Sequence, residues 1–250
     1  MAVFQAALIN EIEKLYKKKK IMVAIIISLS VIIIGQLIIV GMRTGFGLRG
    51  VGSVEFPILV LSVVVNTILP LFTALVAIDC FSSEFSNNMM RVTLTRPVSR
   101  FKIFSAKVTT IVFFILFNLF VLFVFSLLAG FLFNANSATA IGLFKIVISY
   151  GVSLIPMIVL ALGIILLTNI FKNGTSVFFV SILGFLILKA GAVIFSQYSS
   201  LFITSQLDWY NLWLASSFPL NTIVNQLLIM LGYAIMFFTA GYYLFDKKEY

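Results

Sequence analysis

Long apolar stretches recur along the chain, and they constrain its fold more than any other feature of the sequence. Several run for about 20 residues, the length of helix that crosses the hydrocarbon core of a bilayer. Since backbone groups cannot stay unpaired in lipid, runs of this length must be helices. A chain with 62% hydrophobic and 10% charged residues has too little polar surface to cover a soluble globule. The sequence therefore predicts an all-α polytopic membrane protein with one transmembrane domain, residues 1–250.

The apolar stretches predict six transmembrane helices. They fall at residues 21–41, 57–78, 108–133, 146–170, 175–195 and 222–245. An amphipathic helix over residues 4–20 precedes them, with Phe4, Leu8, Ile12 and Leu15 on one face and Glu11, Glu13, Lys14 and Lys17 on the other. We expect this helix to lie flat on the membrane surface.

Lysine and arginine are distributed unevenly between the two sides of this arrangement. They gather in the N-terminal segment, between residues 79 and 107, and after the last stretch. The predicted opposite side holds only Arg43, Arg49 and Lys145. Because basic loops stay in the cytoplasm, we expect both termini inside, in the cytoplasmic membrane of a bacterium. The net charge of +9 follows from this topology, so we expect no nucleic-acid partner.

Residue counts exclude several chemistries. With no His and a single cysteine, Cys80, the chain has no internal disulfide, no HExxH zinc motif and no Ser-His triad. It also lacks the GxxxxGK[ST] phosphate loop, because the nearest stretch, residues 173–176, has no lysine. We therefore expect a chain that is not an enzyme and holds no metal or cofactor. Any ATP that drives it must be bound by another subunit.

Polar residues within the predicted spans follow a helical spacing. The candidates for a translocation cavity are Ser62, Asn66, Thr73, Asn118, Lys189 and Asn225. They could instead form hydrogen bonds between helices. For Lys189 the two readings are an ammonium that extends outward to the membrane surface and a charge that faces the substrate. No Asp or Glu falls inside a span, which disfavours a transporter coupled to protons or sodium.

The predicted external segment, residues 196–220, carries both tryptophans. Trp209 and Trp213 are spaced to share a helical face, and Tyr210 lies between them in the sequence. Aromatic residues of this kind gather at lipid headgroups. The segment therefore predicts a short interfacial helix that anchors the outer side. The alternative is a re-entrant lid over an export path.

The predicted cytoplasmic connection, residues 79–107, has an amphipathic segment followed by a proline. Met89, Met90 and Leu94 supply apolar side chains, and the helix must end before Pro97, because the residue before a proline is disfavoured in helical geometry. Ser99 can cap a second helix that leads into the third span. A short helix held in this way at the end of rigid spans could transmit force from a partner. It could equally be an ordinary basic loop.

This connection resembles the segment after the second span of ABC-2 type transporter permeases. The typical form there is a Glu, a Gly-Thr pair, a Leu-Pro/Arg-Pro-Val-Ser-Arg stretch, and a Gly-Lys that enters the third span. The matching residues are Glu84, Arg91, Leu94, Arg96, Pro97, Val98, Ser99, Arg100 and Lys107. Asn88-Met89 replaces the Gly-Thr pair, and Ala106 replaces the glycine. Six spans and an amphipathic N-terminal helix extend the resemblance over nearly the whole chain.

The resemblance implies a permease half-transporter. It would pair with a second permease, often a copy of itself, and with two cytoplasmic ATPase subunits that bind ATP and Mg²⁺. Residues 86–95 would be a coupling helix seated in the ATPase, and residues 4–20 a connecting helix beside it. The residues assigned to the ATPase contact are Glu84, Met89, Met90, Arg91, Leu94, Arg96, Pro97 and Arg100.

We expect the chain to export an amphipathic peptide, such as an antimicrobial or toxin peptide. Its 27 Phe residues and the lack of acids in the spans favour a largely apolar cargo over a bare cation, which needs oxygen ligands. Sodium, lipids and small hydrophobic compounds are the alternative cargoes. A different class of protein, an ATPase-independent channel or a scaffold in the membrane, is the rival prediction.

Overall fold

The computed structural model describes residues 2–46, 51–82, 99–134, 139–171, 173–215 and 217–247. Every regular element in these ranges is a helix, which confirms the predicted all-α class. In chain order the helices are α1 (Ala2–Tyr16), α2 (Lys19–Phe46), α3 (Glu55–Asn66), α4 (Ile68–Cys80), α7 (Arg100–Phe133), α8 (Ala140–Ile170), α9 (Gly174–Ile194), the 3₁₀ helix η1 (Ser196–Leu201), α10 (Ile203–Gln206), α11 (Tyr210–Leu214) and α12 (Leu220–Lys247).

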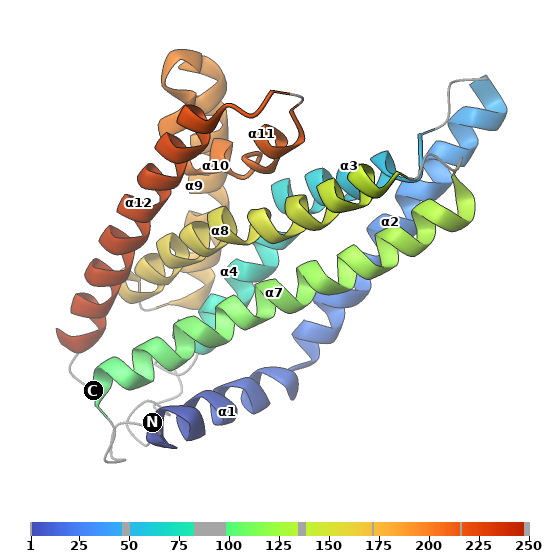
Figure 1. Cartoon of the computed structure of the whole chain (residues 1–250). Coiled ribbons are helices and arrows are strands. Elements are labelled where there is room, and N and C mark those ends of the chain that lie inside the picture. Colours follow the sequence, from blue (N-terminus) through green and yellow to red (C-terminus); the bar gives the residue numbers. More distant parts are fainter. Residues whose placement is uncertain are drawn as a thin grey trace.

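Five of these helices are long and apolar enough to cross a membrane by themselves, namely α2, α7, α8, α9 and α12. The pair α3 and α4 makes a sixth candidate if it counts as one bent span. Figure 1 shows α1 and the last turns of α12 at the same end of the bundle. We call this end, where α4 also finishes and α7 begins, the basic end.

A bend of 44° separates α3 from α4. Pro70 explains it, because proline has no N–H to donate to the carbonyl of Asn66, four residues earlier, and its ring crowds that carbonyl. Thr67, the residue at the break, has φ −133° and ψ −72°, outside the helical region. The sequence predicted one helix over residues 57–78, and the structure has two.

Helix α8 lies at the centre of the bundle, in contact with α4, α7, α11 and α12. It is the most buried of the long helices, whereas α9 and α12 leave most of their apolar surface exposed. Tyr150 in α8 donates a hydrogen bond to the carbonyl of Pro57 in α3 at 2.9 Å, and its hydroxyl lies 2.9 Å from that of Ser126 in α7. One buried phenol therefore joins three helices.

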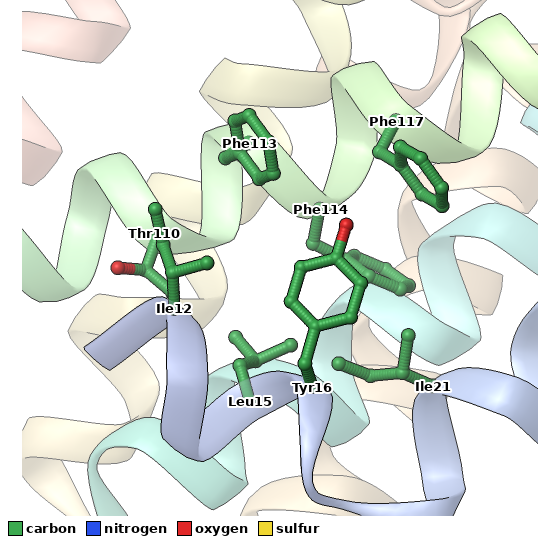
Figure 2. A pocket seen from close by; sticks show the side chains of 8 residues that line it. All are labelled: Ile12, Leu15, Tyr16, Ile21, Thr110, Phe113, Phe114 and Phe117. Carbon is green, nitrogen blue, oxygen red and sulfur yellow. The ribbon is translucent and has the colours of Figure 1, made fainter. Parts of the chain in front are cut away.

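Helix α1 packs along the first half of α7. Figure 2 shows the contact, in which Ile12, Leu15, Tyr16 and Ile21 face Thr110, Phe113, Phe114 and Phe117 across a narrow apolar gap. Leu15 is buried, while Phe4, Leu8 and Ile12 are half-buried. The predicted apolar face of this helix thus contacts protein along α7. Its place at the membrane surface stays a prediction.

The prediction that Glu11 lies on the polar, outward side of α1 is wrong. Only 6% of this residue is exposed. Helical spacing separates polar from apolar positions, but it gives no sign of a charged partner on another helix. That partner, described next, draws Glu11 into the protein.

Candidate functional sites: a charged cluster and an apolar cavity

The charged cluster at the basic end is centred on Lys107, which has no exposed surface. Its ammonium donates to Glu11 Oε2 at 2.9 Å and to the carbonyl oxygen of Cys80 at 2.8 Å. Burial of an ammonium costs several kcal/mol, because the ion loses its hydration. The bonds to Glu11 and Cys80 offset that cost. These bonds fix α7 to α1 and to the last residue of α4.

Glu11 has a second cationic neighbour, because the ammonium of Lys14 lies 2.9 Å from its Oε1. Burial by itself raises the pKa of the Glu11 carboxyl, since it disfavours the charged form. Lys107 and Lys14 outweigh that effect and hold the pKa below its ordinary value. The carboxylate therefore stays ionised at neutral pH.

The start of α2 joins the end of α4 through a second set of ionic contacts. Lys20 Nζ lies 3.0 Å from Asp79 Oδ1, and Lys18 Nζ donates to the Asp79 carbonyl at 3.2 Å. Arg100, the first residue of α7, donates to the carbonyl of Asp246 near the end of α12. Lys18 and Lys20 were predicted only as signals of topology, and the structure gives them partners as well.

Residues of the charged cluster flank the predicted coupling segment in the sequence. Of the residues assigned to the ATPase contact, Arg100 is described, and Glu84, Met89, Met90, Arg91, Leu94, Arg96 and Pro97 lie outside the described residues. Cys80 precedes that segment and Lys107 follows it. The two ends of the connection are thus held by the same ammonium.

A second polar group lies at the break between α3 and α4. Lys189 of α9 donates to Asn66 Oδ1 at 3.0 Å, and Asn66 Nδ2 donates to Asp208 Oδ1 at 2.8 Å. All three side chains are half-buried. The Lys189 ammonium therefore turns toward α3 rather than away from the protein. Asp208, which the sequence placed in an external loop, reaches back to the helix break.

An apolar cavity of about 470 Å³ extends from Asn66 along α9. Its walls come from α4, α8, α9, α10 and α12, and most of the lining side chains are aliphatic or aromatic, among them Leu71, Leu160, Leu167, Phe185 and Phe237. Ser181 and Thr204 are among the few hydroxyl groups on these walls. Neither hydroxyl has a hydrogen-bond partner within the part of the chain that the structure describes.

The other predicted cavity residues lie apart from this space. Ser62 is half-buried on α3, outside the lining of the cavity. Thr73 donates to the Leu69 carbonyl of its own helix at 2.7 Å. Asn118 accepts a hydrogen bond from Ser28 of α2 at 3.3 Å, between helices. Asn225 is exposed on α12. Of the six candidates, Asn66 lines the cavity and Lys189 binds Asn66 at its edge.

The tryptophan segment folds back against the bundle. Trp209 is 2% exposed and packs with Val159 of α8 and with Ile223 and Met230 of α12. Tyr210 is also buried, and Trp213 meets Trp209 edge to face, with 5.6 Å between ring centroids. Trp209 and Tyr210 therefore pack against neighbouring helices, while the interfacial anchor and the re-entrant lid both stay predictions for this segment. Sequence spacing shows that two rings share a face, but not what covers that face.

Residues 7–188 match the family described as "ABC-2 family transporter protein", which is well over half of the chain. The chain belongs to the ABC-2 transporter family. Members of this family are the transmembrane component of ABC transporters and work with a separate ABC ATPase. The matched range holds Glu11, Cys80 and Lys107 of the charged cluster and Asn66 at the helix break, and it ends one residue before Lys189. Among curated proteins, none matches the chain.

Proposed function

We propose that this ABC-2 protein is the permease subunit of an ATP-driven exporter of amphipathic peptides in the bacterial cytoplasmic membrane. It would act with a second copy of itself and with two cytoplasmic ATPase subunits, which bind ATP and Mg²⁺. The basic end would face the cytoplasm, because it carries the lysines of α1 and α2 and the predicted coupling segment.

The two hydrogen bonds of the Lys107 ammonium, to Glu11 and to the Cys80 carbonyl, are the main support for this proposal. One ammonium joins α1, α4 and α7 at the residues that flank the coupling segment. A push on that segment would therefore move three helices together, as a rigid body. A surface loop that only balances topology needs no buried ion pair at its base, and this favours a force-transmitting role over the rival channel or scaffold.

The cavity supports an apolar cargo. Its walls offer few oxygen atoms, whereas a sodium ion requires several oxygen ligands. The same observation also favours a second candidate cargo, a lipid or a small hydrophobic compound. Peptide is the first choice, because the predicted spans are rich in Phe and the chain has no acid within them to pair with a small cation.

Co-purification with ABC ATPase subunits of the same organism tests the proposal. The complex is placed in nanodiscs, and ATP hydrolysis is measured with and without a cationic amphipathic helical peptide. We expect a stable complex whose turnover rises several-fold with the peptide. A complex that responds only to lipids or hydrophobic compounds would favour the second cargo. The absence of any complex would move the ATPase-independent class to first place.

Charge reversal tests the coupling assignment within the same assay. Arg91→Glu combined with Arg96→Glu should reduce recovery of the ATPase at least tenfold, because both arginines are predicted at the ATPase contact. Arg43→Glu is the matched control, since this arginine is predicted on the opposite side of the membrane. Equal recovery for all variants, in protein that elutes as a single species, would reject the coupling role.

A further inference from the structure

The cavity beneath the break between α3 and α4 has the features of a ligand site. Its volume of about 470 Å³ lies within the range of roughly 300–1,000 Å³ found for small-molecule pockets. Thr204 and Ser181 line it, and they are only 2% and 9% exposed. Their hydroxyl oxygens find no hydrogen-bond partner in the residues that the structure describes. A buried polar atom without a partner is costly unless a ligand or water supplies one.

A cationic group stands at one end of this apolar space. The ammonium of Lys189 has three N–H donors. In the described residues one of them is used, by Asn66 Oδ1 at 3.0 Å. Asn66 is itself a wall residue of the cavity, and the Phe185 ring centroid lies 5.7 Å from the same ammonium. The site thus combines a long apolar volume with a cation whose hydrogen-bonding capacity is partly unused.

Asp208 is the acid that faces this group. Its Oδ1 accepts a hydrogen bond from the Asn66 amide at 2.8 Å, and Asn66 bridges it to Lys189. The carboxylate therefore already has a donor, while the ammonium retains two. A ligand with a positive head group would meet Lys189 as a like charge. A negative head group would complete the hydrogen bonds of the ammonium instead.

We propose that the cavity binds one amphiphile with a single anionic head group, a carboxylate or a phosphate, and a hydrocarbon tail. The head group binds Lys189 beside Asn66, and Thr204 donates a hydrogen bond near it. The tail lies among the aliphatic and aromatic side chains of α4, α8 and α12. The site belongs to one copy of the chain, so it goes beyond the export function and does not depend on the ATPase.

Two glycines provide a test of the cavity. A Cβ added at Gly184, on the cavity wall, or at Gly232, exposed on α12, would meet no atom within 4 Å. Gly184→Leu therefore fills the cavity, and Gly232→Leu makes the same change outside it. The probe is cis-parinaric acid, a fluorescent carboxylate with a hydrocarbon tail, titrated into purified protein in detergent without nucleotide or partner.

We expect saturable binding at one probe per chain. Gly184→Leu should weaken it roughly tenfold or more, equivalent to about 1.4 kcal/mol, because a few methylene groups of the tail lose their place. Gly232→Leu should change it less than about twofold. Ser181→Leu is a second cavity-filling variant, in case Gly184→Leu does not fold. Equal binding by the cavity-filling and control variants, or no saturable binding by the wild type, would overturn the proposal.

The head group is tested by pairing a variant with a neutral probe. Lys189→Met should weaken binding of cis-parinaric acid at least tenfold and leave binding of its methyl ester unchanged, because only the acid can pair with the ammonium. Equal losses for acid and ester would overturn the assignment of the head group to Lys189.

The source of the amphiphile is identified by native mass spectrometry of freshly extracted protein. A phospholipid mass retained by the wild type and Gly232→Leu, but lost in Gly184→Leu, would identify a membrane lipid as the ligand. A retained fatty-acid mass with the same dependence would identify a free carboxylate amphiphile. A lipid retained equally by all three proteins would count against the site. None of these measurements uses transport, so a failed export assay would leave the result intact.

Discussion

The ammonium of Lys107 and the carboxylate of Glu11 lie 2.9 Å apart, in a site where neither side chain has more than 6% exposure. Their residues are 96 positions apart in the sequence, so the pair holds the N-terminal helix to the start of α7. Breaking a buried pair by removal of one partner typically costs about 3–5 kcal/mol, because the remaining charge is stranded.

Single neutralising substitutions should therefore destabilise the protein strongly. We expect Lys107→Met or Glu11→Gln to cost about 3 kcal/mol of unfolding free energy, and the double variant to cost less than the sum of the two. Thermal unfolding of the purified protein measures this. Lys14→Met is the control, because the Lys14 side chain is 36% exposed and its bond to Glu11 should contribute at most about 1 kcal/mol. Additive losses at Lys107 and Glu11 would contradict the pairing.

The lowered pKa of Glu11 predicts a loss of stability in acid. In the unfolded chain this carboxyl titrates near 4.5, and in the folded protein it titrates below that value. The stabilisation is therefore complete above about pH 4.5 and disappears as the pH falls through the folded-state pKa.

The unfolding temperature, measured from about pH 7 down to pH 3, should fall more steeply in the wild type than in Glu11→Gln. Glu13→Gln is the matched control, because Glu13 is exposed on the same helix. A wild-type profile that runs parallel to that of Glu11→Gln would contradict the prediction.

Gly130 allows α7 to approach the backbone that leads into α3. A Cβ at this position would lie 2.7 Å from the carbonyl oxygen of Ser53, which is backbone and cannot move aside cheaply. Gly130→Ala should therefore destabilise the protein by about 1–3 kcal/mol, the usual range for overpacking. Gly151→Ala is the control, since a Cβ there meets nothing within 4 Å. It should be neutral or stabilise α8 by up to about 1 kcal/mol, because alanine favours a helix. Equal unfolding temperatures for the two variants would show that the close approach does not matter.

The helices themselves were predictable because lipid imposes a length and an apolar composition on each span. Their ends were less so. Helix α7 begins at Arg100, directly after Ser99, where the sequence predicted a helix that leads into the third span. This helix and the predicted span at 108–133 are one continuous helix, and the Ser99 side chain makes no capping hydrogen bond. The bend at Thr67 had a visible signal in Pro70, whose missing N–H falls opposite the carbonyl of Asn66.

The two sites were predicted only as separate residues. Asn66 and Lys189 were both candidates, but the sequence gave no reason to pair side chains that lie 123 positions apart. Asp208 was expected in an external loop, and it enters the group because η1, α10 and α11 fold back onto the helices. Glu11 was assigned to a polar surface because helical periodicity describes a single helix. Which side chains become buried depends on the neighbouring helices as well.

Asn66 is the bridge between the two charges of that group, and its removal should weaken the packing of α9 on α3 and α4. In Asn66→Leu the Lys189 ammonium loses its acceptor and Asp208 loses its donor, while a side chain of similar size remains. We expect a cost of about 1–3 kcal/mol of unfolding free energy, toward the lower end because the three side chains are half-buried.

Asn225→Leu makes the same change at an exposed position of α12, and it should stay within about 0.5 kcal/mol of the wild type. Adding Lys189→Met to Asn66→Leu should cost less than it does alone, because the ammonium has already lost its partner. If Lys189→Met costs the same in both backgrounds, the ammonium and the amide are not coupled, and the bridge is not part of what holds α9 in place.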